Sequence, residues 1–347
     1  MLNKNNLIKI GLIMVTGIVL AILNATLGRY QLRILNLAGI YIVLGLSLNL
    51  INGFTGLFSL GHAGFMAVGA YASALLTMSP AQKSVNFFVK PIVPFLANIE
   101  IGFLPAIIIG GVVAAIVGAV LAAPILRLKD DYLAIATLGF GEIIRVVFTN
   151  TQSLTNGALG LKGLPSYTNT GYTWTIVIIT IAFMFSLRRS SYGKAFMAIR
   201  EDEIAAESMG IDLFKHKLLA FTIGSFFAGV GGALLAHLMG TIDPLMFRFL
   251  MTFNILLIVV LGGIGSISGT IISAIIVTIS MEWLRFLDGP IDLGFAVIHS
   301  VPGMRMVLFS LLLMIVILYY QHGLMGQDEI TLEFVKEKLK RFKKKEA

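Results

Sequence analysis

The chain has no cysteine and few charged residues. The first absence excludes several kinds of chemistry, and the second bears on whether the protein is soluble or membrane-embedded. Without cysteine it cannot form disulfides, bind iron–sulfur clusters through thiolates or use a thiol nucleophile. Asp, Glu, Lys and Arg make up only 13% of the 347 residues, whereas soluble domains carry about 25%. Hydrophobic residues reach 57%. The composition therefore favours a membrane protein over a soluble one.

The motifs of common enzymes and metal sites are also missing. The Gly193-Lys194 pair is followed by Ala195 and lacks the glycine-rich cradle of a phosphate-binding loop. The five histidines have no metal-ligand spacing, and no Ser/His/Asp arrangement can be argued. A net charge of +8 is better explained by basic cytoplasmic loops of a membrane protein than by nucleic-acid binding. We expect no metal, no cofactor, no nucleic-acid partner and no enzymatic activity.

Long apolar segments recur along the chain, and most approach the length of about 20 residues that crosses a bilayer as a helix. They predict an all-α, polytopic membrane protein of about ten transmembrane helices, with Gly-rich, broken segments among them. The ten segments are 7–27, 34–52, 54–78, 101–126, 132–149, 173–187, 218–239, 250–262, 267–287 and 304–321.

The distribution of basic residues predicts the orientation. Lys and Arg concentrate at the N-terminus, in 127–131, in 188–217 and in the tail, and cytoplasmic segments collect these residues. An even number of spans places both termini on one side, so we predict N-in and C-in, with 79–100 and 150–172 as outer loops. Residues 1–326 form the predicted transmembrane domain. The basic, amphipathic tail 327–347 would rest on membrane lipid or touch a partner.

Two glycine- and serine-rich stretches, 52–64 and 262–269, interrupt the apolar pattern. Irregular backbone at membrane depth is tolerated only inside protein or along a wet cavity, and broken helices are a usual place for transport pathways. His62 lies in the first stretch. Its side chain would either take part in a pathway or form a hydrogen bond that ties the broken backbone.

Few ionisable residues fall within the apolar segments, and four of them form pairs. Glu142 with Arg145, and Glu282 with Arg285, are spaced three residues apart, so each pair shares one helix face. We interpret both as structural ion pairs, which lower the cost of a charge in the bilayer. The alternative is a proton or ion relay.

A short charged helix is predicted within the inner loop 188–217. Asp202 suits the N-cap, and Gly210 suits the left-handed position that ends a helix. The helix would present a small apolar patch of Ala205, Ala206 and Met209 and an acidic edge of Glu203 and Glu207. Such a helix either inserts into a cleft of another protein or lies on the membrane surface.

Six motifs, in order and spread over most of the chain, resemble the LivM-type permease subunits of branched-chain amino-acid ABC transporters. They are NLINGFTGLFSLGHAGFMAVGAY (49–71), LRLKDDYLAIATLGFGEIIR (126–145), LTNGALGLKGLP (154–165), SYGKAFMAIREDEIAAESMGI (191–211), KLLAFTIGSFFAGVGGAL (217–234) and VLGGIGSISG (260–269). The chain departs from the family at Thr270, where proline is frequent, and at 321–324.

The resemblance also assigns roles to residues. Arg200 to Gly210 would dock on an ATPase subunit, because Ala205, Ala206 and Gly210 match the pattern E-A-A-x-x-x-G. Ile204 occupies the glutamate position, with Glu203 one residue earlier. The outer loop 154–165 would face a substrate-binding protein. Residues near the translocation path would be Ser59, Gly61, His62, Gly262, Gly263 and Gly265.

The function that the resemblance implies is ATP-driven import of leucine, isoleucine or valine across the bacterial cell membrane. The partners would be two ABC ATPase subunits, a second, LivH-type permease and a substrate-binding protein, with ATP hydrolysed by the partners. The alternatives are import of urea, amides or other amino acids by the same kind of transporter, and an ion-coupled secondary carrier that works alone.

Overall fold

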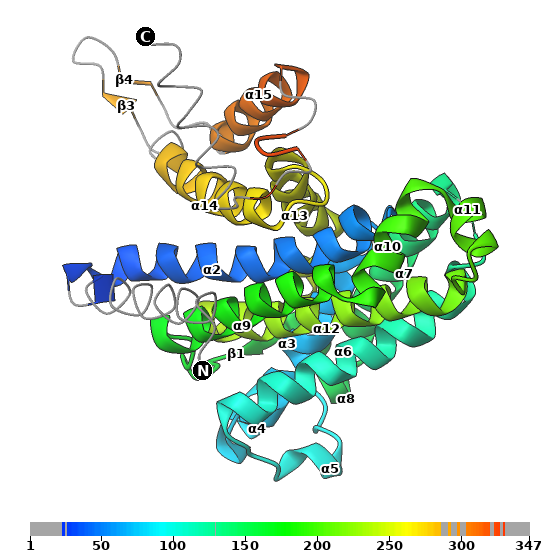
Figure 1. Cartoon of the computed structure of the whole chain (residues 1–347). Helices are drawn as coiled ribbons and strands as arrows, with labels where there is room; N and C mark the ends of the chain where they lie inside the picture. Colours follow the sequence, from blue (N-terminus) through cyan, green and yellow to red (C-terminus); the bar gives the residue numbers. More distant parts are fainter. Residues whose placement is uncertain are drawn as a thin grey trace, which may run out of the picture.

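The fold is a bundle of helices, as the apolar pattern predicts (Figure 1). The computed structural model describes residues 23–24, 26–128, 130–285, 291–292, 297–298, 303–319, 323–326 and 329. Within these residues five helices are long and apolar enough to cross a membrane by length and composition. The predicted segment 7–27 lies largely outside the described residues, and so does the tail apart from Glu329.

Each predicted segment from 34–52 onward contains a helix in the structure. The long helices, in chain order, are α2 (Arg29–Asn49), α3 (His62–Thr77), α6 (Phe103–Ile125), α7 (Asp130–Asn150), α9 (Thr170–Arg189), α12 (Leu213–Met239), α13 (Phe249–Gly262), α14 (Ile267–Trp283) and α15 (Met304–Tyr319).

The two glycine- and serine-rich stretches break the helical path, as predicted. α2 passes into a π-helical turn, η1 (Leu50–Phe54), and residues 55–61 are not helical before α3 begins at His62. Likewise, residues 263–266 separate α13 from α14. α3 has 16 residues and α13 has 14. At about 1.5 Å per residue neither spans a hydrocarbon core of about 30 Å alone.

Helices α3, α6 and α12 pack at close backbone distance through glycine. A Cβ atom placed on Gly69 would lie 2.2 Å from the carbonyl oxygen of Gly229, and one on Gly232 would lie 2.1 Å from that of Met66. A Cβ on Gly110 would lie 2.8 Å from the carbonyl oxygen of Gly69. Small residues allow helices to approach this closely in a membrane.

Short elements from the two predicted outer loops and from the connection between α12 and α13 come together at one end of the bundle. They are α4 (Pro80–Asn86), α5 (Pro94–Ala97), α8 (Gln152–Thr155), η2 (Gly157–Leu159), β1 (Leu161–Lys162), β2 (Thr241–Ile242) and η3 (Pro244–Phe247). β1 pairs with β2 in antiparallel register. Asn86 exchanges hydrogen bonds of 2.8 and 3.0 Å with the backbone of Lys162, which ties the two loops together.

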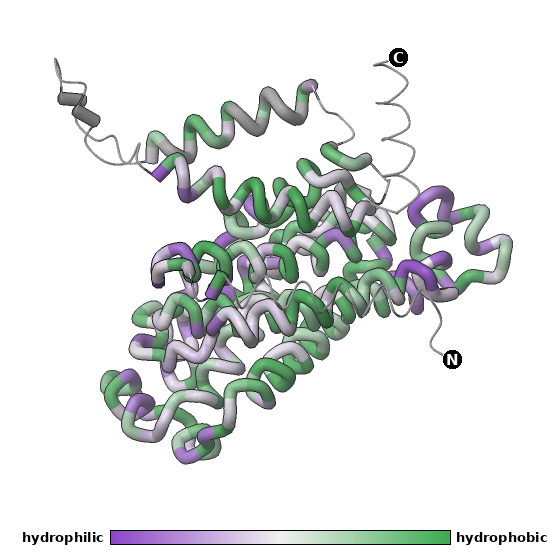
Figure 2. Tube along the Cα trace, turned by 60° about the vertical axis from the view of Figure 1, so that its left-hand side comes forward, coloured by the Kyte–Doolittle hydropathy of each residue, from purple (hydrophilic) through white to green (hydrophobic). Residues whose placement is uncertain are grey.

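The opposite end carries α10 (Ser191–Glu201) and α11 (Glu203–Ser208) (Figure 1). Hydrophilic residues gather in the loops at the ends, and hydrophobic residues predominate along the helices between them (Figure 2). A further pair of short strands, β3 (Ile291–Asp292) and β4 (Val297–Ile298), lies between α14 and α15 in the sequence.

The long apolar helices make the chain a multi-pass membrane protein.

Candidate functional site

The predicted inner loop 188–217 contains a helix that sequence analysis missed. The Ser190 hydroxyl caps α10 by accepting a hydrogen bond of 3.2 Å from the amide of Gly193. Phe196 and Ile199 are buried, and α10 packs against α9, α11, α12 and η1. Its apolar face extends over only three turns, so the sequence pattern is weak without its neighbours.

The predicted caps of α11 are both present. One carboxylate oxygen of Asp202 accepts hydrogen bonds from the amides of Ile204 and Ala205, at 2.9 and 3.0 Å. Gly210 has a φ of +84°, and the amide of Ile211 donates to the carbonyl of Ala206 at 3.1 Å. These bonds form the glycine-ended motif that satisfies the last carbonyls of a helix.

The predicted apolar patch on α11 is partly wrong. Ala206 is 3% exposed because α11 packs against α10 and α12, which turns this side chain inward. The exposed apolar residues are Ile204, at 79%, and Met209, at 83%, beside the exposed Ala205. Glu203 forms an ion pair with Lys217 of α12. A helix of six residues has too little pattern to reveal which face points inward.

Arg200 connects the end of α10 to both glycine- and serine-rich stretches. Its Nη1 donates a hydrogen bond of 2.9 Å to the carbonyl oxygen of Gly53 in η1. A Cβ on Gly265 would lie 2.7 Å from the same nitrogen, and a Cβ on Gly56 would lie 2.9 Å from Arg200 Cγ. Gly56 and Gly265 both have positive φ angles. Only glycine therefore fits easily where the backbone passes the guanidinium.

Asn49, which sequence analysis missed, joins α2 to the turn between α13 and α14. Its Oδ1 accepts a hydrogen bond of 2.8 Å from the amide of Gly265. Its Nδ2 donates to the carbonyl of Ser266 at 2.9 Å and to Thr270 Oγ1 at 3.0 Å. The sequence does offer a signal for this role, because the Asn49 side-chain amide lies within the apolar run LSLNLI. A polar group buried in such a run needs hydrogen-bond partners.

The six predicted path residues fall into two separate places. Gly262, Gly263 and Gly265 lie at the α13–α14 turn, where a Cβ on Gly262 would be 2.5 Å from the carbonyl carbon of Gly269. Ser59, Gly61 and His62 lie at the start of α3. Ser59 and His62 are fully buried, and a Cβ on Gly61 would be 2.3 Å from the carbonyl oxygen of Thr137 in α7.

The start of α3 is held by side chains from three helices. His62 Nε2 hydrogen-bonds to Ser47 Oγ of α2 at 2.8 Å. Thr137 of α7 accepts from the amide of Leu60 at 3.0 Å, and Thr252 of α13 accepts from that of Ala63 at 2.9 Å. These bonds satisfy backbone groups that the broken helix would leave unpaired.

Both predicted ion pairs are present. Arg145 Nε lies 2.6 Å from Glu142 Oε2, and Arg285 Nη1 lies 2.9 Å from Glu282 Oε1. The Tyr30 hydroxyl also hydrogen-bonds to Glu282. Among the described residues, no group of three or more His, Cys, Asp and Glu side chains could hold a metal ion.

Glu329 anchors the chain after α15 to the bundle. Its carboxylate accepts hydrogen bonds from the amides of Ile267 and Ser268 at 2.7 and 2.9 Å. It also forms an ion pair with Arg188 near the end of α9. A carboxylate at the first turn of α14 is favoured by the helix dipole.

The sequence model of one protein family, described as the permease component of branched-chain amino acid transport systems, matches residues 30–322. The chain belongs to this family. No solved structure matches it.

The chain was compared with individual members of the family, and the aligned region covers a different share of each protein. It is 35% identical over 292 residues to the high-affinity branched-chain amino acid transport system permease protein LivM of Escherichia coli K12, covering 74% of this chain and 64% of that protein. A probable LivM of Methanocaldococcus jannaschii is 25% identical, over 87% of this chain and 94% of the relative. The E. coli LivH permease is 34% identical over 31% of this chain and 35% of its own length. The chain therefore spans less than two thirds of the E. coli LivM protein.

Proposed function

We propose that this chain is the membrane-spanning permease subunit of an ATP-driven ABC importer for leucine, isoleucine and valine. A substrate-binding protein delivers the amino acid, and two partner ATPases hydrolyse ATP. A second, LivH-type permease completes the membrane channel in the bacterial cell membrane. Membership of the permease family supports this assignment, and so does the similarity to relatives named LivM and LivH.

The observation that carries the proposal is the connection made by Arg200. The α10–α11 pair exposes Ile204 and Met209 at its tip, and its other side contacts η1 through the Arg200–Gly53 hydrogen bond. A push on α11 by an ATPase would therefore reach the break between α2 and α3 and the turn between α13 and α14. Such a contact is what a coupling element requires, because the motion must pass from the docked subunit to the broken helices.

In this assignment α10 and α11 face the cytoplasm, and both termini lie inside. The end with α4, α5, β1 and β2 faces outward and meets the binding protein. Glu329 contacts Arg188 beside α10, on the side of the membrane that this proposal gives to the ATPases. This arrangement agrees with the concentration of Lys and Arg in 188–217 and in the tail.

Reconstitution of the full transporter tests the function. Proteoliposomes holding this chain, the second permease and the ATPases should import radiolabelled leucine only with ATP and loaded binding protein. Import driven by an ion gradient through this chain alone would overturn the proposal. Import of urea without import of branched-chain amino acids would move the substrate to the alternative class.

A matched pair of variants tests docking. Ile204→Asp places a charge on the exposed tip of α11, whereas Leu245→Asp changes an equally apolar, 60% exposed residue at the opposite end. The ATPase subunits should co-purify with the wild-type chain and with Leu245→Asp but not with Ile204→Asp. Normal recovery with Ile204→Asp would show that α11 is not the docking element.

A further inference from the structure

The chain that follows α15 returns to the turn between α13 and α14 (Figure 1). The amide of Leu324 donates a hydrogen bond of 2.8 Å to the carbonyl of Leu261. The next amide, that of Met325, donates one of 3.2 Å to the carbonyl of Gly262. Both carbonyls belong to the last turn of α13, where a helix has no partners of its own for these groups. The chain after α15 therefore supplies the bonds that the end of α13 lacks.

Glu329 extends this contact to α14 and α9. Its carboxylate accepts hydrogen bonds from the amides of Ile267 and Ser268 in the first turn of α14, at 2.7 and 2.9 Å. The same carboxylate forms an ion pair with Arg188 in the last turn of α9. The Glu329 side chain is only 8% exposed, so salt screens these contacts far less than it screens contacts on the surface. One carboxylate thus joins the start of α14 to the end of α9.

The position of Arg188 connects this contact with the coupling element. Arg188 is the second-last residue of α9, and α10 begins at Ser191. The other end of α10 carries Arg200, which contacts the break between α2 and α3 through Gly53. The two ends of α10 therefore lead to the two broken parts of the bundle. A contact at one end alone would let α10 pivot about that point, whereas contacts at both ends make the two breaks follow its movement together.

We propose that Glu329 is a positioning residue for coupling, which makes the start of α14 follow the end of α9 when the ATPases move α10. This inference rests on the proposed function as the permease subunit of an ABC importer. Arg200 delivers the same movement to η1. Without the Glu329 contact α14 lags behind α10, so ATP hydrolysis continues but each ATP imports less substrate.

Neutral variants of both partners test this role in the reconstituted transporter. Glu329→Gln and Arg188→Gln should each lower the leucine imported per ATP hydrolysed by about tenfold, because each removes a charged and largely buried contact. Arg188→Lys keeps the charge and should retain most of the ratio. Arg189→Gln, at the exposed neighbouring position, should keep the wild-type ratio. Recovery of the complex with the ATPases, measured in parallel, separates a loss of coupling from a loss of folding.

The double variant Arg188→Gln/Glu329→Gln shows whether the two residues act through one contact. If they do, it should lose no more than the worse single variant, because the second change removes nothing further. Losses that multiply would overturn the inference, and so would a wild-type ratio in Glu329→Gln. Failure of ATP-driven import by the wild-type transporter would instead refute the proposed function.

A covalent link replaces the ion pair and tests the inference without relying on neutral variants. Because the chain has no cysteine, Arg188→Cys/Glu329→Cys can be joined in the purified chain by a reducible, thiol-specific cross-linker before the transporter is assembled. The leucine imported per ATP should be low in the double cysteine variant, rise on cross-linking and fall again on reduction. A cross-linked transporter that hydrolyses ATP without import would show that this contact has to open during transport, which is the opposite of the role proposed.

Discussion

Replacement of Arg200 by glutamine should uncouple ATP hydrolysis from import. The change removes the charged hydrogen bond to the Gly53 carbonyl and leaves a shorter, neutral polar side chain. Hydrogen bonds that involve a charged group contribute about 1.5–3 kcal/mol. The partly exposed pair of Arg200 with Glu201 adds little, because solvent screens such pairs.

That energy sets the size of the expected effect. If the Arg200–Gly53 bond links α10 to η1, its loss lowers the coupling between the ATPase and the broken helices by about 10- to 150-fold, since about 1.4 kcal/mol corresponds to a factor of ten. The assay is leucine imported per ATP hydrolysed in proteoliposomes. We expect ATP hydrolysis to continue while this ratio falls at least about tenfold.

Arg189→Gln is the matched control. Arg189 ends α9 in the same basic region, and within the described residues it makes no hydrogen bond or ion pair. The ratio should therefore stay at the wild-type value. An unchanged ratio in Arg200→Gln, at normal assembly with the ATPases, would refute the role given to Arg200.

Three further predictions concern local stability. Asp202→Ala removes both cap bonds of α11, which costs about 0.5–2 kcal/mol, so limited proteolysis within α11 should quicken; an unchanged cleavage rate would contradict this. Glu329→Gln should lower hydrogen-exchange protection at the start of α14, and unaltered protection would show that the anchor is dispensable. Gly229→Ala would place a Cβ 2.5 Å from that of Ala114 and should destabilise by about 1–3 kcal/mol, seen as a lower melting temperature in detergent. Gly139→Ala, with open space around its Cβ position, should not lower it.

The helices were predictable because bilayer length and apolar composition are properties of the local sequence. The breaks at 55–61 and 263–266 were predictable for the same reason, since glycine and serine are poor formers of continuous helix. The caps of α11 depend on Asp202 and Gly210, which lie within the segment itself. These features need no knowledge of tertiary contacts.

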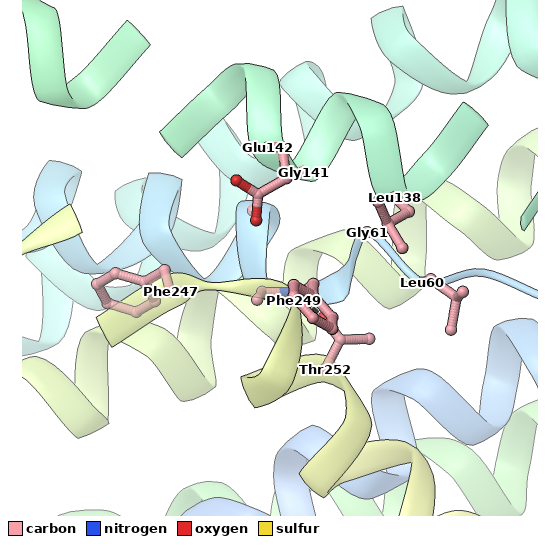
Figure 3. A pocket seen from close by; sticks show the side chains of 10 residues that line it. Leu60, Gly61, Leu138, Gly141, Glu142, Phe247, Phe249 and Thr252 are labelled. Carbon is pink, nitrogen blue, oxygen red and sulfur yellow. Dashed lines mark hydrogen bonds between the residues drawn. The ribbon is translucent and has the colours of Figure 1, made fainter. Parts of the chain in front are cut away.

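The tertiary contacts of these segments could not be predicted, because the residues that they contact lie far away in the sequence. Asn49 reaches the turn at Gly265, and Arg200 reaches Gly53. The inward turn of Ala206 depends on the positions of α10 and α12. The spacing of Glu142 and Arg145 predicts their ion pair, but only the meeting of α3, α7 and α13 places Glu142 near Gly61 and Phe249 (Figure 3).

The glycine contacts among α3, α6 and α12 have a consequence for motion. At Gly69, Gly229 and Gly232 the backbones are in direct contact, so no side chain stands between the helices at these points that could change rotamer to let them slide. We therefore expect these three helices to travel as one rigid block during transport. Relative movement must then fall at the polar joints held by single side chains, chiefly Asn49 and Arg200, where a few hydrogen bonds can exchange without the unpacking of a core.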